Sequence, residues 1–215
     1  MTDRISERYG LFRLPGYAAV MPPSTKTADP VGEYDRTLSN LIICHHAVEA
    51  SDGWATSVRA SRPPMTIMGS LGGVEAGLRQ LRRSRPLETC TVDIAPDLEV
   101  TAPTVEETLR IKAYLILQRN QVRDYLDVVT LSAHMGADSA VAVLRDIDDF
   151  YVDRSGERGS VLTSLVLQLA EPSPRDVTVT RELARYKGLN PRWHEWSSVV
   201  GACRDLALRL ADGAS

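Results

Sequence analysis

The chain has 215 residues, enough for one large domain or two small ones with a buried core. Apolar residues make up 43% of it and charged residues 25%, which is typical of a folded globular protein and excludes a wholly disordered chain. Because the formal net charge is −3, nucleic-acid binding would require a local basic patch. The short apolar runs, the polar N-terminus and the three widely spaced cysteines predict neither a membrane span, a secretory leader nor a disulfide framework. We therefore expect a cytoplasmic protein.

The first half of the chain is predicted to be an irregular arm followed by a small α/β region. Four prolines and a polar stretch interrupt residues 1–35, and apolar residues at helical spacing follow between Tyr34 and Ala50. Further on, short apolar runs and turn residues predict two strands that flank a turn and an amphipathic helix. The predicted elements are a strand at 65–68, a turn at 69–73, a helix whose apolar stripe begins at Leu71 and runs to about residue 84, and a strand at 89–94.

The second half is predicted to be helical. Thr104 and Glu107 match a capping box at a helix start, and Gly136 suits the position after a helix end. The predicted helices cover residues 104–118, 121–135, 138–151, 161 to about 171, and about 190 to the last residues. The predicted fold class is therefore α/β of the α+β kind, with a small sheet and flanking helices in residues 1–100 and a helical region in residues 101–215.

Five charged residues lie on two consecutive predicted helices. Lys112 and Arg119 belong to the first helix, and Arg123, Asp124 and Asp127 belong to the second. An antiparallel pair of helices would bring these side chains together. Such a cluster can hold the phosphates of a nucleotide, and its carboxylates can bind a divalent cation or activate a hydroxyl group. The same residues can also form a network of salt bridges that orients the two helices.

The spacing of these residues resembles the signature of the AbiEii/AbiGii-type nucleotidyltransferase toxin family. In that family a helix lysine, here Lys112, is followed by an arginine, here Arg119, and then by an Arg-Asp-x-x-Asp helix, here residues 123–127. The resemblance covers about residues 65–150. It implies an N-terminal nucleotidyltransferase fold and the role of a toxin in a toxin–antitoxin pair. The implied reaction transfers NMP from an NTP to RNA, at the 3′ end of tRNA, and the implied partners are the NTP, tRNA and a cognate antitoxin.

The resemblance also implies which residues form the site. A glycine and a serine at a helix start would bind the triphosphate together with basic side chains. Acidic side chains would take part in the nucleotidyl transfer. The implied nucleotide-binding residues are Gly69, Ser70, Lys112, Arg119 and Arg123, and the implied catalytic residues are Lys112, Asp93, Asp124 and Asp127.

Mg²⁺ is the implied cofactor, because transferases of this kind neutralise the phosphates with a divalent cation held by carboxylates. The family places an Asp-x-Asp pair on the strand beside the Gly-Ser turn. This chain has Asp93 followed by Ile94 and Ala95, so one acid stands where two are expected, and Asp93 is the predicted metal ligand.

Two other interpretations remain open at this point. The incomplete Asp-x-Asp motif is compatible with a degenerate nucleotidyltransferase fold that binds a nucleotide or a protein without catalysis. The same cluster is also compatible with a kinase-like phosphotransferase. A run of arginines between positions 79 and 85 would either receive a tRNA backbone or lie in water at the end of the predicted 71–84 helix.

Overall fold

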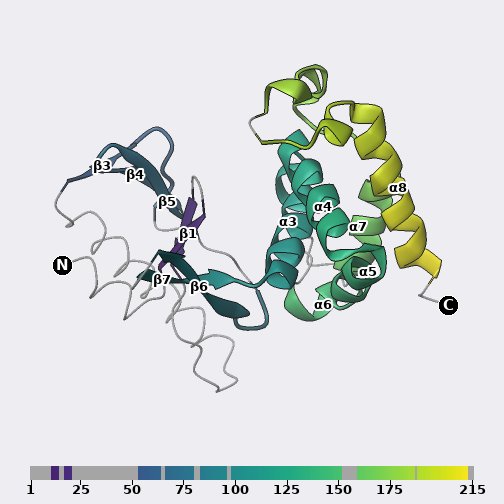
Figure 1. Cartoon of the computed structure of the whole chain (residues 1–215), viewed down its shortest axis with the longest axis horizontal. Coiled ribbons are helices and arrows are strands. Elements are labelled where there is room, and N and C mark those ends of the chain that lie inside the picture. Colours follow the sequence, from purple (N-terminus) through teal and green to yellow (C-terminus); the bar gives the residue numbers. More distant parts are fainter. Residues whose placement is uncertain are drawn as a thin grey trace. The chain divides into compact units, whose positions relative to one another are not determined.

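The computed structural model describes residues 11–14, 17–20, 53–63, 66–79, 83–95, 98–151, 159–186 and 188–212. The chain divides into two compact units, a strand-containing unit (Met1–Arg82 and Pro86–Pro103) and a helical unit (Arg83–Arg85 and Thr104–Ser215). In the described part, strands occur in the first unit and α-helices in the second (Figure 1). The predicted α+β class is therefore confirmed.

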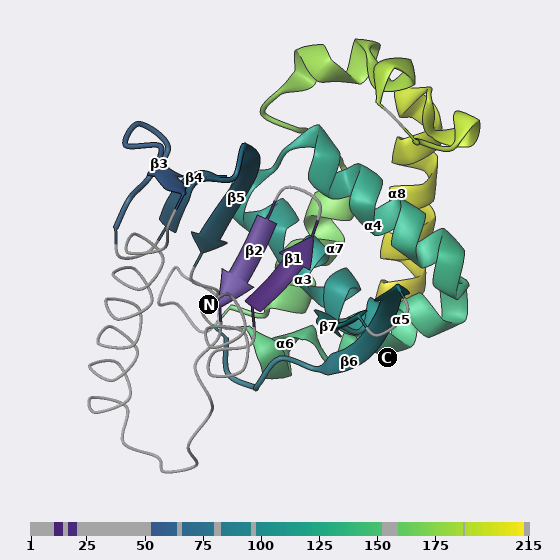
Figure 2. The same cartoon turned by 60° about the vertical axis from the view of Figure 1, so that its left-hand side comes forward.

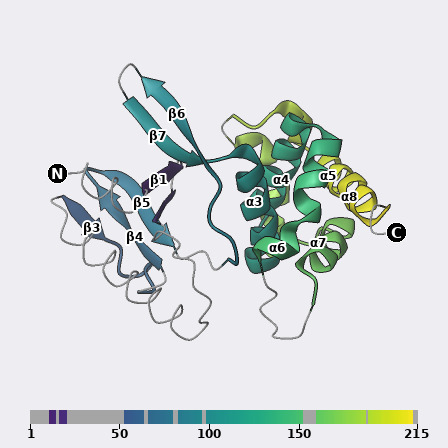
Figure 3. The same cartoon turned by 90° about the horizontal axis from the view of Figure 1, so that it is seen from below.

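The described residues of the strand-containing unit form three small sheets of antiparallel strands. A hairpin of β1 and β2 lies alongside β5 (Figure 2), and β6 and β7 form a separate hairpin (Figure 3). The strands are β1 (Leu11–Leu14), β2 (Tyr17–Val20), β3 (Trp54–Thr56), β4 (Thr66–Leu71), β5 (Val74–Arg79), β6 (Thr89–Ala95) and β7 (Leu98–Pro103). The helix predicted between Tyr34 and Ala50 lies outside the described residues.

The helix predicted at 71–84 is wrong, because residues 74–79 form strand β5, which pairs with β4. Gly72 and Gly73 have φ values of 58° and 78°, the left-handed conformations that a two-residue hairpin turn requires. Beyond this turn Val74, Ala76 and Leu78 alternate with other residues at the two-residue period of a strand. The hairpin turn therefore overrides the helical spacing of Leu71, Val74, Leu78 and Leu81.

Gly69 lies within β4 and not in a turn before a helix. Its neighbours across the sheet are Thr56 of β3 and Ala76 of β5. A Cβ atom at this position would lie 2.5 Å from the carbonyl oxygen of Ala55 and 2.6 Å from the ring of Trp54. The indole nitrogen of Trp54 donates a hydrogen bond to Thr56 at 2.8 Å. Glycine is therefore required at position 69 because the Trp54 ring covers it.

The helical unit contains a pair of long antiparallel helices, α3 and α4, against which the later helices pack (Figure 3). Thr104 caps the first of these with its side-chain oxygen, as predicted, but the Glu107 carboxylate contacts Arg83 and Arg110 and does not complete the predicted capping box. The elements are α3 (Val105–Arg119), α4 (Val122–Met135), α5 (Ala137–Arg145), α6 (Ile147–Phe150), α7 (Val161–Ala170), the 3-10 turns η1 (Val177–Arg181), η2 (Leu183–Arg185) and η3 (Pro191–Trp193), and α8 (Trp196–Asp212).

The core of the helical unit is formed by apolar side chains from all of its main helices. Fully buried members include Leu109, Ile116, Tyr125, Leu144, Leu165 and Leu210. The helices predicted at 104–118 and 121–135 are confirmed. The helix predicted at 138–151 is divided at Asp146, and the last predicted helix begins as a 3-10 turn at Pro191 before α8.

We expect Gly69→Ala to destabilise the sheet of β3, β4 and β5 selectively. The added methyl group overlaps a backbone carbonyl and the Trp54 ring, and overpacking of this kind costs about 1–3 kcal/mol. Hydrogen exchange measured by mass spectrometry should become faster in β4 and remain unchanged in α3 and α4.

Gly201→Ala is the matched control, because Gly201 lies in α8 with open space around its Cβ position. Alanine in an exposed helix interior is favoured by about 0.5–1 kcal/mol. Unchanged exchange in β4 of Gly69→Ala would contradict the close packing of Trp54.

Candidate functional site

The turn between α3 and α4 brings four of the sequence-predicted residues together as two ion pairs. Lys112 Nζ donates to Asp127 Oδ2 at 2.7 Å, and the Arg119 guanidinium donates to Asp124 Oδ1. The first pair is partly exposed, with side-chain exposures of 16% and 30%, whereas Asp124 is completely buried. Both carboxylates are therefore held by cations of the neighbouring helix.

Asp124 also stabilises the start of α4. Gln121 and Asp124 form a capping box, in which the Asp124 carboxylate accepts the backbone N–H of Gln121 at 3.4 Å. The chain reverses direction at Asn120, whose φ of 52° is the left-handed conformation that asparagine tolerates at a helix end. The buried carboxylate thus fixes the helix corner.

A hydrogen-bonded network anchors this corner to the segment after α7. The Tyr125 hydroxyl donates to Asn120 Oδ1 at 2.6 Å and accepts from Gln168 at 2.8 Å. Asp176 accepts the first backbone N–H of α4, that of Val122, at 2.8 Å. Burial raises the pKa of Tyr125 to about 12, so the hydroxyl stays protonated and keeps its donor role at neutral pH.

Tyr186 lies close enough to Asp127 for this carboxylate to affect the pKa of its hydroxyl. Burial raises the pKa of its hydroxyl, nearby Asp176 and Asp127 raise it further, and Arg123 lowers it. Arg123 itself is exposed. The Tyr186 hydroxyl is therefore close enough to Arg123 and Asp127 of α4 for their charges to affect it.

The remaining predicted site residues belong to the strand-containing unit. Gly69 and Ser70 lie inside strand β4, and Asp93 is exposed on β6, which is in another sheet. The prediction that Gly69 and Ser70 begin a helix is wrong, and a β-strand does not provide the positive dipole end that was to grip a triphosphate. Within the described residues, no group of three or more His, Cys, Asp or Glu side chains could hold a metal ion. Mg²⁺ remains a prediction from the sequence.

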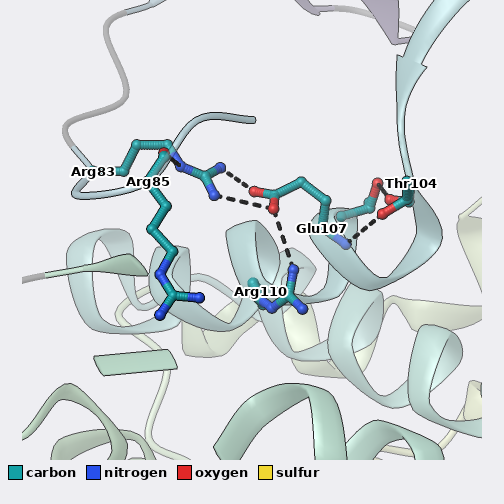
Figure 4. Close-up of polar contacts among 6 residues, drawn as sticks. Arg83, Arg85, Thr104, Glu107 and Arg110 are labelled. Atoms are coloured by element: carbon teal, nitrogen blue, oxygen red, sulfur yellow. Dashed lines mark hydrogen bonds and ion pairs between the residues drawn. The ribbon is translucent and has the colours of Figure 1, made fainter. Parts of the chain in front are cut away.

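Among the described residues, the most deeply buried charged cluster is one that the sequence did not indicate. Glu107 of α3 is completely buried, and its carboxylate accepts two hydrogen bonds from the Arg83 guanidinium, of which Arg83 Nη2 to Oε2 is 3.0 Å (Figure 4). Arg110 donates to the same Oε2 at 3.3 Å. The Arg83 side chain is 3% exposed, so this forked ion pair is nearly dry.

Arg83 belongs to a three-residue segment, Arg83–Arg85, which we call the strap. The strap is part of the helical unit although the residues before and after it belong to the strand-containing unit. The Ser84 N–H donates to the Phe150 carbonyl at 2.8 Å, and Arg85 forms an exposed ion pair with Asp149. The Arg83–Glu107 pair is buried, whereas the exposed Arg85–Asp149 pair is worth up to about 1 kcal/mol.

The aromatic rings of Phe150, Tyr151 and Tyr114 lie beside this cluster. The guanidinium carbons of Arg110, Arg85 and Arg83 lie 4.1, 5.0 and 5.4 Å from the centre of the Phe150 ring. Tyr151 stacks on Tyr114 with ring centres 4.1 Å apart. Burial raises the pKa of the Tyr151 hydroxyl far above its usual value, so this ring remains neutral beside Arg83.

The basic run from Arg79 to Arg85 was the available signal for this cluster, but it pointed to a different role. Sequence analysis placed it at the end of a helix as a tRNA-binding patch or a solvated surface. No helix is present between 74 and 79, and Arg83 is buried on a carboxylate. A buried ion pair 24 positions apart in sequence leaves no local pattern, so spacing could not predict it.

Comparisons with known proteins identify several relatives with the name MmpL11. The chain is 40% identical over 109 residues to the "Heme uptake protein MmpL11" of Mycobacterium tuberculosis, which covers 49% of this chain and 11% of that protein. It is 31% identical over 134 residues to the "Mycolic acid-containing lipids exporter MmpL11" of Mycolicibacterium smegmatis, covering 62% and 14%. It is 29% identical over 139 residues to the "Probable transport protein MmpL11" of Mycobacterium leprae, covering 62% and 13%.

The chain thus spans only 11–14% of the length of these relatives. No family model and no solved structure matches it. Within the described residues, no helix is both long enough and apolar enough to cross a membrane.

These relatives show that the resemblance to AbiEii/AbiGii-type nucleotidyltransferase toxins is wrong. Their names describe transport, uptake or export, so the predicted transferase, the toxin role, and the NTP, tRNA and antitoxin partners are wrong as well. The degenerate-transferase and kinase-like alternatives are not supported by any of these relatives. The predicted cytoplasmic location is wrong, because the relatives are named as uptake, export and transport proteins. The physical reason is that Lys112 pairs with Asp127 and Arg119 pairs with Asp124 between antiparallel helices. These two ion pairs require no nucleotide.

The two aspartates of α4 should differ strongly in their effect on stability. Asp124→Asn leaves Arg119 without its buried counter-charge and should lower the free energy of unfolding of the helical unit by about 3 kcal/mol. Asp127→Asn removes only a partly exposed pair and should cost less than about 1 kcal/mol. Urea unfolding followed by helical circular dichroism measures both, and equal losses would contradict the buried role of Asp124.

Proposed function

We propose that this chain supplies a folded, non-catalytic part of a transport protein similar to MmpL11. The observation that carries the proposal is the 40% identity over 109 residues to the M. tuberculosis heme uptake protein. In this role the chain would help to position or regulate the transport machinery, and its buried ion pairs would maintain the shape of that part.

The extent of the similarity supports a contribution of both units to this function. The matches to the M. smegmatis and M. leprae relatives cover 62% of the chain, which is longer than either compact unit alone. Those matches therefore include residues of both units.

The outer surface of the helical unit carries exposed charged side chains. This indicates that it contacts water or polar protein surfaces. Arg204, Asp205 and Arg209 of α8 are exposed, and Arg209 forms ion pairs with Asp205 and with Asp138 of α5. Charged side chains repeated on successive turns are costly in an apolar lipid layer and are typical of a hydrated helix face. We infer that this face of the helical unit would contact water or polar protein surfaces and not lipid tails.

A segment exchange in the M. smegmatis exporter tests this function. In a strain that lacks the exporter, we would express an exporter in which the matched segment is replaced by the corresponding residues of this chain. Because the segments share sequence, we expect the exchange to restore export of mycolic acid-containing lipids to near the wild-type level, measured by thin-layer chromatography of labelled surface lipids.

Two variants of the exchanged segment provide the comparison. Glu107→Gln should reduce export or protein abundance, because it removes the carboxylate that two arginines contact, whereas the same substitution at the exposed neighbour, Glu106→Gln, should behave like the parent exchange. An exchanged exporter that reaches wild-type abundance and exports no lipid would contradict the proposed function.

A further inference from the structure

The strap contacts Glu107, Asp149 and Phe150 of the helical unit, and we call this set of contact residues the slot. Both of its flanking segments belong to the strand-containing unit, so the chain enters the helical unit for only three residues before leaving it again. Figure 4 shows the Arg83 guanidinium reaching the Glu107 carboxylate from a loop outside α3. This segment makes side-chain and backbone contacts of the kind that a bound peptide makes.

The floor of the slot is the buried carboxylate of Glu107. It faces the planar fork of Arg83, a geometry that arginine satisfies with two parallel hydrogen bonds and lysine does not. The backbone N–H of Glu107 is held by the Thr104 side chain at 3.1 Å, so the first turn of α3 keeps the carboxylate in position.

The wall and rim of the slot recognise the rest of the strap. The Phe150 ring lies within cation–π distance of Arg83 and Arg85, and the Phe150 carbonyl accepts the Ser84 N–H. Asp149 pairs with Arg85 at the exposed rim. The two arginine side chains of the strap are thus contacted by the Glu107 and Asp149 carboxylates and by the Phe150 ring. The Phe150 carbonyl accepts the backbone N–H between them.

The slot retains a partner for its buried charge without the strap. Arg110 comes from α3 itself and donates to Glu107 Oε2 at 3.3 Å, and its guanidinium lies 4.1 Å from the centre of the Phe150 ring. Removal of Arg83 would therefore leave Glu107 paired with Arg110. With the strap in place, the Glu107 carboxylate contacts two guanidinium groups, those of Arg83 and Arg110. Arg110 alone balances its charge, so Arg83 adds a second positive charge to a neutral pair.

We propose that the helical unit contains a recognition site for an Arg-x-Arg peptide, which the strap occupies within the chain as an exchangeable ligand. The site would bind the same segment when it is supplied as a separate peptide. The proposal does not depend on the transport function, because it rests on the contacts of Arg83, Ser84 and Arg85 alone.

Peptide binding to a full-length chain with a vacated slot tests the proposal. Arg83→Ala/Arg85→Ala removes both side chains of the strap, and a fluorescein-labelled peptide of residues 82–88 supplies them again. We expect saturable binding by fluorescence anisotropy. A strap joined by short linkers has an effective concentration on the order of millimolar, so the wild-type chain should bind the peptide about 10- to 100-fold more weakly than the vacated chain.

Three controls separate recognition from general charge attraction. A peptide with Arg83→Lys should lose most of its affinity, because lysine cannot form the fork. Glu107→Gln in the vacated chain should also weaken binding, whereas Asp138→Asn should leave it unchanged. The single variant Arg85→Ala breaks only the exposed rim contact and should give peptide affinity between those of the wild-type and vacated chains.

Three results would overturn the proposal. Absence of binding to a vacated chain with wild-type helical circular dichroism shows that the site does not recognise the peptide. Loss of helical structure in the vacated chain shows that the strap is an integral part of the fold and not an exchangeable ligand. Equal binding of the arginine and lysine peptides shows an attraction without the forked geometry.

Discussion

A carboxylate that no solvent reaches lies in the first turn of α3, and its charge must be balanced by guanidinium groups. Arg110 comes from the same helix, and Arg83 comes from a segment whose neighbours in sequence belong to the other unit. Burial makes the interaction costly to break, because removal of its partners would leave a charge in a medium that solvates it poorly. The Arg83 side chain reaches the helical unit to meet this requirement, and the guanidinium groups of Arg83 and Arg110 both lie over the Phe150 ring.

The ion pairs between α3 and α4 follow the same physics with a different degree of burial. Asp124 combines a buried counter-charge with a helix-capping role, whereas the Lys112–Asp127 pair lies near the surface, where water screens it. The residue types and spacings of these pairs are those that a nucleotide site would use. Antiparallel helices place oppositely charged residues in contact for structural reasons as well, so the spacing of the five residues does not distinguish the two uses.

The elements that sequence analysis predicted correctly are those whose signals are local. The capping side chain of Thr104 and the break at Asn120 act on the residues beside them, and α3 and α4 begin and end close to the predicted positions. The β4–β5 hairpin was mispredicted as a turn and a helix because Leu71, Val74, Leu78 and Leu81 also fit a helical period. The two consecutive glycines at 72 and 73 were the stronger signal, since both adopt the left-handed conformation of a hairpin turn.

Contacts between distant residues explain why the rest of the site could not be predicted. Gly69 was interpreted as part of a phosphate-binding turn, and its actual constraint is the ring of Trp54 on the neighbouring strand. Arg83 was interpreted as part of a basic surface, and its partner is 24 positions further along the chain. In both cases the residue type was informative and the partner was not visible in the sequence. A glycine or an arginine has several physical uses, and only the group that it contacts in three dimensions decides between them.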